Sequence, residues 1–185
     1  MSRLIPAVAA VLLVAVAPGC GGERELPPVD PGLSVFTGKG FTVGYPKGWK
    51  QDPGKRIFRG ADFEVLRPEP PQRPPQASWS VFTEERNRLM GRMVDAFVAQ
   101  SRTARDFRLL ERRRLTMQDA AAQVVRKSYT APSGMDGWTT LQQVDLFVDL
   151  GTGTVADVRM IVIAPGADQA ARLMDGVAGS FRITA

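Results

Sequence analysis

The residue types that could do chemistry are few in this chain of 185 residues, which has one cysteine and no histidine. Histidine is the usual general base of enzymes and the commonest metal ligand, so its absence leaves little from which to build a catalytic or metal site. The single cysteine, Cys20, follows an apolar stretch and the small residues Pro18 and Gly19. Its thiol has no disulfide partner in the chain, and an unpaired thiol in an exported protein needs an explanation.

The first 19 residues have the three parts of a secretory signal: a positive start at Arg3, a short apolar core and small residues before a cleavage point. The apolar run over residues 4–17 has 14 residues, whereas a helix needs about 20 to cross the hydrocarbon core of a bilayer. A permanent membrane helix is therefore the weaker alternative. We expect residues 1–19 to be removed on export.

Ala17-Pro18-Gly19-Cys20 resembles the lipobox of bacterial lipoproteins, in which a small residue precedes an invariant cysteine. The resemblance implies that Cys20 carries a diacylglyceryl thioether and is the first residue of the mature protein. An incidental cysteine in an ordinary signal peptide is the alternative. Because two or more acyl chains anchor a protein stably, we expect the protein to be lipid-anchored at the extracytoplasmic face of the cell membrane.

The segment after Cys20 is rich in proline, glycine and charge. Its sequence, GGERELPPVDPG over residues 21–32, is typical of a tether. The remaining length is sufficient for one domain with its own core. We therefore divide the chain into a lipoprotein signal peptide at residues 1–19, a lipidated cysteine and tether at residues 20–33, and a globular domain at residues 34–185.

Hydrophobic periodicity predicts an α+β domain. Alternation of apolar and polar residues indicates strands, and apolar residues three and four apart indicate helices. The expected strands span residues 41–45, 57–59, 62–66, 78–83, 107–117, 121–130, 138–150 and 155–164, with a short extended segment at 180–183. The expected helices span residues 86–101 and 167–179. The proline-rich residues 68–75 should form a loop, and residues 151–154 should form a hairpin turn.

Carboxylates occur in two groups that could act together. Glu84 and Glu85 are neighbours at the expected start of a helix, where the helix dipole explains them. Asp145, Asp149 and Asp157 could converge on a cation across the expected hairpin. We favour a simpler interpretation, in which these three aspartates lie on a solvated face of the sheet.

Arginines gather between the first helix and the following strand. They are Arg102, Arg105, Arg108 and the run Arg112 to Arg114. On a strand, Arg112 and Arg114 point one way and Arg113 the other, so the run does not form one patch. We favour a solvated strand that pairs with acidic neighbours, and contact with an anionic lipid or polymer is the alternative.

Two short signatures at the ends of the domain resemble PsbP-like domains. The segment from Gly40 to Trp49, GFTVGYPKGW, resembles their opening strand and turn, of the form G-F-x-(V/I)-x-Y-P-x-G-W. The segment from Val177 to Arg182, VAGSFR, resembles their closing helix and Ser-Phe segment. With the lipobox, the chain is most similar to the actinobacterial LpqN-type lipoproteins, and DcrB-type lipoproteins are a neighbouring option.

The resemblance implies an antiparallel β-sheet of about six or seven strands sandwiched between helices, the PsbP-like α/β/α sandwich. Trp49 should cap the edge of the core after a tight turn that Pro46 and Gly48 allow, and Phe181 should fill the core at the end of the last helix. These positions are structural, so they support a fold more than a function.

The resemblance also implies a binding or assembly factor. Gly38-Lys39-Gly40 lacks the spacing of a P-loop, and Ser180 has no histidine to activate it. We therefore expect no enzyme, no catalytic residue, no cofactor and no metal.

Export and the lack of a basic helix argue against nucleic acid as a partner. The expected partners are the membrane, through the anchor, and an envelope protein or envelope component.

Two functions follow from these expectations. The first is a non-catalytic binding or scaffolding module of the cell envelope. The alternative is a carrier of lipid or another small molecule, with a pocket between sheet and helix.

Overall fold

A computed structural model of the chain describes residues 31–184, except residues 53, 55, 70–75, 86–88, 119, 133–136, 152 and 164–166. Cys20, the expected signal peptide and most of the expected tether lie outside the described residues, as does most of the proline-rich segment. In the last helix, side chains are described from Arg172 onward.

The described part contains nine strands and two helices. In chain order they are β1 (Leu33–Gly38), β2 (Phe41–Pro46), β3 (Phe63–Leu66), β4 (Ala77–Glu85), α1 (Met90–Ser101), β5 (Arg105–Met117), β6 (Ala120–Pro132), β7 (Trp138–Asp149), β8 (Thr154–Ile163), α2 (Ala167–Ser180) and β9 (Arg182–Ile183).

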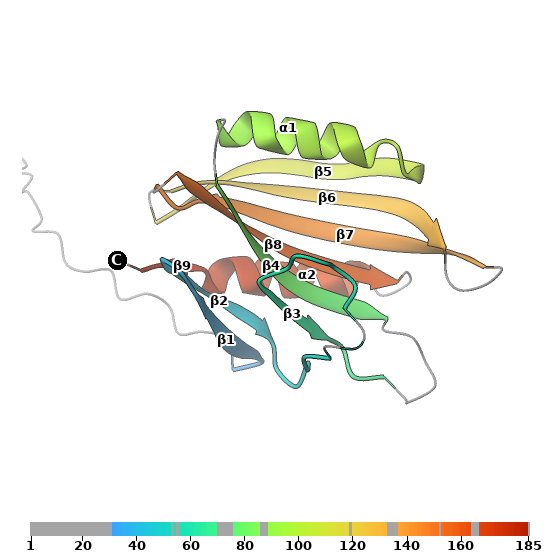
Figure 1. Ribbon diagram of the computed structural model, residues 1–185, viewed down its shortest axis with the longest axis horizontal. Helices are drawn as coiled ribbons and strands as arrows, with labels where there is room; N and C mark the ends of the chain where they lie inside the picture. Colours follow the sequence, from blue (N-terminus) through green and yellow to red (C-terminus); the bar gives the residue numbers. More distant parts are fainter. Residues whose placement is uncertain are drawn as a thin grey trace, which may run out of the picture.

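Six strands form an antiparallel sheet in the order β3-β4-β8-β7-β6-β5 (Figure 1). The long strands β5 to β8 are joined as a meander, and the pairing of β7 with β8 runs from Leu141↔Ile163 to Asp149↔Val155. A smaller sheet has the order β1-β2-β9. The fold class expected from the sequence is therefore confirmed.

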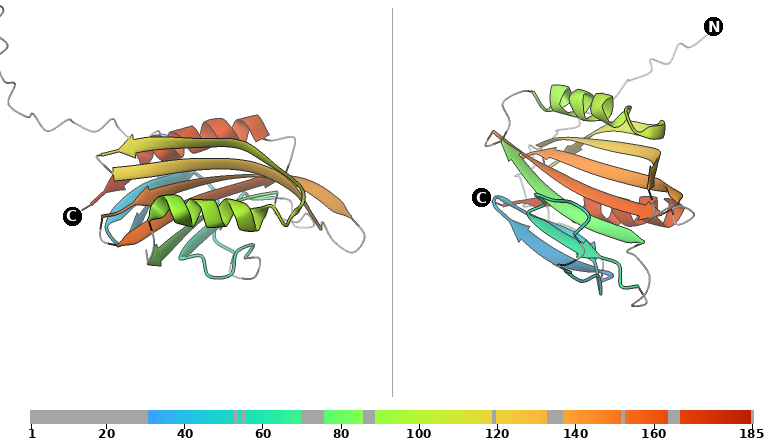
Figure 2. Two further views of the ribbon diagram at one scale, coloured as in Figure 1. Left: turned by 90° about the horizontal axis from the view of Figure 1, so that it is seen from above. Right: turned by 45° about the vertical axis from the view of Figure 1, so that its right-hand side comes forward.

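The two helices lie on opposite faces of the six-stranded sheet (Figure 2). Helix α1 covers one face, on which Val125, Phe147 and Val155 contact it. Helix α2 and the smaller sheet cover the other face. Val124, Leu146 and Val148, each next in sequence to a residue of the α1 face, are buried there. This division follows from the strands, because successive side chains point to opposite faces.

The larger core lies between the sheet and the α2 layer. Trp79 and Phe41 are fully buried there, and Phe41 stacks on Phe181 with ring centroids 5.2 Å apart. Phe181 thus fills the core after α2, as the sequence indicated. Trp49 packs against the same core, and the preceding turn places Gly48 at a φ of +84°, where a residue without a Cβ is favoured.

The α1 layer is built by residues three and four apart. Met90, Val94 and Val98 are buried on the sheet, and Phe97 meets Phe147 edge-to-face at 5.2 Å. Leu89 lies at the N-cap position of the helix and is 70% exposed. Neither described helix is long and apolar enough to cross a membrane.

Two local predictions were wrong, and one strand was missed. Residues 57–59 form a bend instead of a strand, because the backbone N–H groups of Ile57 and Phe58 donate to the Glu64 carboxylate at 3.1 and 3.3 Å. Glu84 and Glu85 end strand β4 and do not begin a helix, so a helix dipole does not explain them. Strand β1, which pairs with β2 along its whole length, was not predicted.

Candidate functional site

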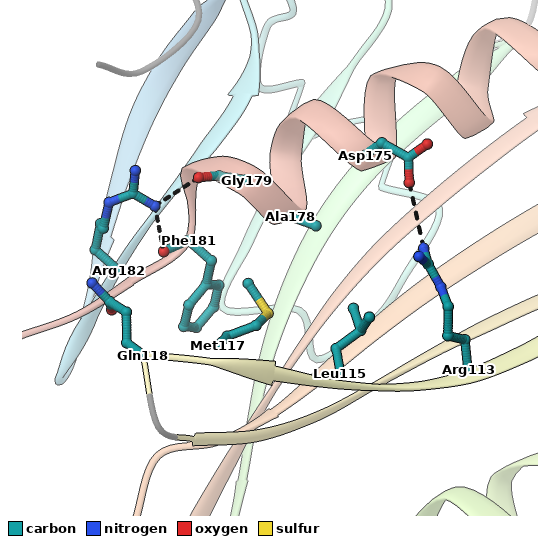
Figure 3. A pocket seen from close by; sticks show the side chains of 9 residues that line it. All are labelled: Arg113, Leu115, Met117, Gln118, Asp175, Ala178, Gly179, Phe181 and Arg182. Carbon is teal, nitrogen blue, oxygen red and sulfur yellow. Dashed lines mark hydrogen bonds and ion pairs between the residues drawn. The ribbon is translucent and has the colours of Figure 1, made fainter. Parts of the chain in front are cut away.

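A groove with a volume of about 370 Å³ lies between the end of strand β5 and the end of helix α2 (Figure 3). We call it the β5–α2 groove. Its lining residues are Arg113, Leu115, Met117 and Gln118 from β5 and the turn after it, and Asp175, Ala178, Gly179, Phe181 and Arg182 from α2 and the residues after it.

Alternation along β5 places its lining residues on the face toward α2. In the β5–β6 register Arg113 lies opposite Val124, and Leu115 lies opposite Ala122. Val124 and Ala122 belong to the core beneath α2. On α2, Asp175 and Ala178 are three residues apart and therefore share a face. The groove thus combines two segments that are about half the domain apart in the chain.

The floor of the groove is apolar. Leu115 and Met117 pack partly buried against the main core, and Phe181 is 1% exposed. The Phe181 ring is held by its stacking on Phe41. A rigid aromatic base beside two flexible side chains is suited to an apolar group of a ligand.

Charged groups form the rim. Arg113 is 3.2 Å from Glu111 and 3.7 Å from Asp175, and because these side chains are 40–73% exposed, the ion pairs are weak. Arg182 donates from Nη1 to the carbonyl oxygens of Gly179 and Phe181 at 2.6 and 2.8 Å, which caps the C-terminal end of α2. The rim therefore presents two guanidinium groups above an apolar floor.

A second polar cluster is buried on the opposite face of the sheet. Arg159 on β8 donates from Nε to Asp145 on β7 at 2.6 Å and from Nη2 to Asp157 at 2.6 Å. Asp145 is 0% exposed and Asp157 is 2% exposed. The rings of Phe58, Phe82 and Phe97 surround the guanidinium, with centroids 5.0, 4.6 and 5.2 Å from Cζ.

The neighbouring Lys127 is also buried. Its Nζ donates to Ser101 Oγ at 2.6 Å and lies 3.8 Å from the centre of the Phe97 ring. Burial lowers the pKa of Lys127 to about 8. Burial, and after it the neighbouring carboxylate of Asp145, raise the pKa of Asp157 to about 8. Each of these groups is committed to a partner within the protein, which indicates a structural role.

These contacts overturn the expectation for the three aspartates. Asp145 and Asp157 do not lie on a solvated face, because helix α1 and the aromatic rings cover them. These two aspartates converge instead on the guanidinium cation of Arg159, which lies between them. Asp149 lies at the end of β7, where its Oδ1 accepts the N–H of Gly151 at 3.1 Å.

The arginine run behaves as expected. Arg112 points toward α1, where its Nη1 is 2.6 Å from Asp95, and Arg113 points toward α2 and Asp175. Arg105 lies over the exposed ring of Trp138 at 4.5 Å. Ser180 holds the end of α2 instead of acting as a nucleophile: its hydroxyl accepts the N–H of Gly44 at 2.7 Å and donates to the Val177 carbonyl at 2.6 Å.

Sequence reasoning identified Arg113 and Phe181 singly but not the groove that they share. The predicted lipidation site, Cys20, lies outside the described residues and stays a prediction. The one signal for the groove was the apolar pair Leu115 and Met117 on a strand otherwise rich in arginine.

No protein-family model matches the chain, and no curated protein matches it in sequence. Solved structures do match it. The cyanobacterial PsbP protein CyanoP from Synechocystis sp. PCC 6803 is 16% identical, covers 89% of this chain and 97% of its own, and has a TM-score of 0.58. The Ran-binding protein Mog1p of Saccharomyces cerevisiae is 11% identical, covers 78% of this chain and 90% of its own, and has a TM-score of 0.53.

LpqN of Mycobacterium tuberculosis, described as involved in cell envelope biogenesis, is also similar in structure. It is 14% identical, covers 84% of this chain and 87% of its own, and has a TM-score of 0.47. The resemblance to LpqN-type lipoproteins in particular therefore stays a prediction. At these identities the likenesses establish the fold alone: the chain has the PsbP/Mog1-like fold.

Proposed function

We propose that the protein is a membrane-anchored, extracytoplasmic lipoprotein whose folded domain is a non-catalytic binding or scaffolding module of the cell envelope. The observation that carries the binding role is the β5–α2 groove, which joins an apolar floor to a rim with two arginines. Grooves of this composition bind ligands through apolar contact and orient them through a few polar groups. The lipobox at Cys20 and the proline-rich tether after it support the location.

The ionisable groups of the described residues support binding over catalysis. The buried Asp145, Asp157 and Lys127 and the partly buried Arg159 contact one another or neighbouring side chains, and α1 covers them. The buried Glu64 accepts the N–H groups of Ile57 and Phe58. The groove itself offers Arg113, Asp175 and Arg182, which pair with each other or with backbone carbonyls. A catalytic site instead requires a nucleophile or base aimed at a space that a substrate can enter.

A carrier of lipid or another small molecule is the second candidate. The groove favours it in one respect, because its volume falls within the range of about 300–1,000 Å³ that is usual for small-molecule sites. The layer beneath α1 does not favour it, since Met90, Val94 and Val98 fill that layer against the sheet. We therefore place macromolecular binding first.

Photo-crosslinking in intact cells tests the proposal. A photoreactive phenylalanine analogue replaces Leu115 in the groove, and a control variant carries it at Leu89, which is exposed on the opposite side of the sheet. We expect reproducible capture of one envelope protein from position 115 and none from position 89. Capture of lipid alone would favour the carrier, and identical products from both positions would contradict a specific binding surface.

A further inference from the structure

Strand β5 is an edge of the six-stranded sheet. Among the described elements only β6 pairs with it, although β5 is 13 residues long. The opposite edge, β3, has only four residues, and the Lys50↔Leu66 bridge lies beside it. An edge strand presents unpaired N–H and C=O groups along one side, which can pair with another extended chain.

Two parts of β5 differ in regularity. Its pairing with β6 shifts register between Arg105 and Arg108 and between Leu109 and Glu111. From Arg112↔Val125 to Met117↔Ala120 the pairing is continuous. Irregular stretches make an edge strand less able to pair with another chain. The regular part of β5 can still accept a strand, and it forms one wall of the β5–α2 groove.

The charge of β5 is unbalanced and lies on both faces. The strand carries five arginines against two acidic residues. Arg112 points to the α1 face and Arg113 to the α2 face. Exposed apolar residues also occur on this edge, with Leu109 40% and Leu110 44% exposed. The arginines alone would keep other strands away from this edge. The exposed leucines on the same strand instead favour contact with a partner.

We propose that the regular part of β5 accepts an extended acidic segment of a partner protein as an additional strand. This inference rests on the proposed binding function and names the ligand class. Alternate side chains of the segment would lie over Leu115 and Met117, next to Arg113, and the remaining side chains would face Arg112 and Arg114. Main-chain hydrogen bonds supply affinity in this mode, and the alternating side chains supply specificity.

Charge complementarity selects this occupant. A second copy of the chain, paired antiparallel through β5, would bring two arginine-rich strands together, and like charges directly opposite each other are destabilising. A flat anionic bilayer would meet only one of the two faces onto which Arg112 and Arg113 project. An extended acidic chain can reach both rows of arginines and the backbone edge between them.

The test uses the full-length lipoprotein in nanodiscs of neutral lipid and a short capped peptide in which glutamate and valine alternate. In two further peptides every second backbone amide is N-methylated. One peptide carries the methyl groups on the amides of its glutamates, and the other carries them on the amides of its valines. We expect one methylated peptide to bind as well as the parent and the other to bind about tenfold or more weakly, because only one set of amides faces β5. Amide exchange should slow at residues 112–117 when the parent peptide binds.

Variants and other probes complete the test. Arg113→Glu should weaken binding of the parent peptide about fivefold, and the control Arg92→Glu on exposed α1 should leave it unchanged. A lysine–valine peptide should not bind. Equal binding of both methylated peptides, or binding only to vesicles of phosphatidylglycerol, would overturn the strand-addition proposal. Crosslinking from Leu115 to a protein would then still leave the proposed function standing, so the two failures are distinguishable.

Discussion

Arg159 and Asp145 face each other as paired residues on β8 and β7, with Nε 2.6 Å from Oδ1. The same guanidinium also holds Asp157 from its Nη2. One cation therefore serves two buried carboxylates. Because separating buried charges from their partner is costly, this arrangement makes the α1 side of the sheet dependent on a single residue and on pH.

Replacing Arg159 by methionine should destabilise the protein strongly. The variant removes the one guanidinium that the buried Asp145 and Asp157 share, with both of its hydrogen bonds, for which we expect a loss of about 3 kcal/mol in the free energy of unfolding at neutral pH. Urea denaturation measures it. The matched control is Arg113→Met, whose ion pairs are exposed and should contribute less than about 0.5 kcal/mol. Equal losses in the two variants would contradict a structural role for the buried cluster.

Asp157 should make the protein less stable as the pH rises from acid to neutral. Its pKa is raised to about 8 by burial and by Asp145, whereas the unfolded value is near 3.9. Between these values the native state binds a proton that the unfolded state has released, so stability falls with rising pH and levels off above the folded pKa. Unfolding in urea from pH 4 to pH 8 should show this fall. Asp157→Asn should flatten it, and Asp95→Asn, at an exposed residue, should not.

Lys127 should act in the opposite direction at higher pH. Burial lowers its pKa to about 8, and the unfolded value is near 10.4. Above the folded pKa the unfolded state binds more protons, so the contribution of Lys127 to stability rises with pH. Each unit of pKa difference corresponds to about 1.4 kcal/mol.

The comparison of wild type with Lys127→Met from pH 8 to pH 9.5 isolates this contribution. That range lies below the ionisation of Tyr129 in the folded protein, where burial raises its pKa to about 12. We expect the stability difference between the two proteins to change steadily in favour of wild type. A constant difference across the range would show that Lys127 keeps an ordinary pKa in the folded protein.

The strand pattern around Val144, Leu146 and Val148 made the main sheet predictable, because period-two alternation is a local property of the chain. The same alternation could not show that Asp145 is buried. A polar face that meets water and a polar face that a helix covers have the same pattern, and the covering residues lie about fifty positions earlier in α1.

The groove was unpredictable for a related reason. Leu115 and Phe181 come together only when α2 packs back on the sheet, and neither has a distinctive neighbourhood in the sequence. Residues 57–59 illustrate local competition: a strand-like apolar pair was expected to extend, but the Glu64 carboxylate accepts its backbone N–H groups and bends it. Contacts outside the segment itself therefore override its intrinsic strand preference.

Gly44→Ala should loosen the attachment of α2 to the smaller sheet. A Cβ at this position would lie 2.7 Å from Ser180 Oγ and 2.7 Å from Leu33 Cδ1. Since Ser180 Oγ also accepts the Gly44 N–H, we expect a loss of about 1–3 kcal/mol in thermal or urea unfolding. Gly176→Ala within α2 is the control: its Cβ meets nothing within 4 Å, and helix propensity should give a gain of up to about 1 kcal/mol.

Cys20→Ala should release the protein from membranes. Each buried methylene of an acyl chain contributes about 0.8 kcal/mol, so loss of the diacylglyceryl thioether removes the whole anchor. The measurement is membrane fractionation together with incorporation of labelled fatty acid. Gly21→Ala, immediately after the predicted cleavage point, serves as the control and should remain labelled and membrane-bound. If Cys20→Ala still sediments with membranes while wild type takes up no fatty acid, the protein is held there by some contact of its folded domain and Cys20 is not the lipidation site.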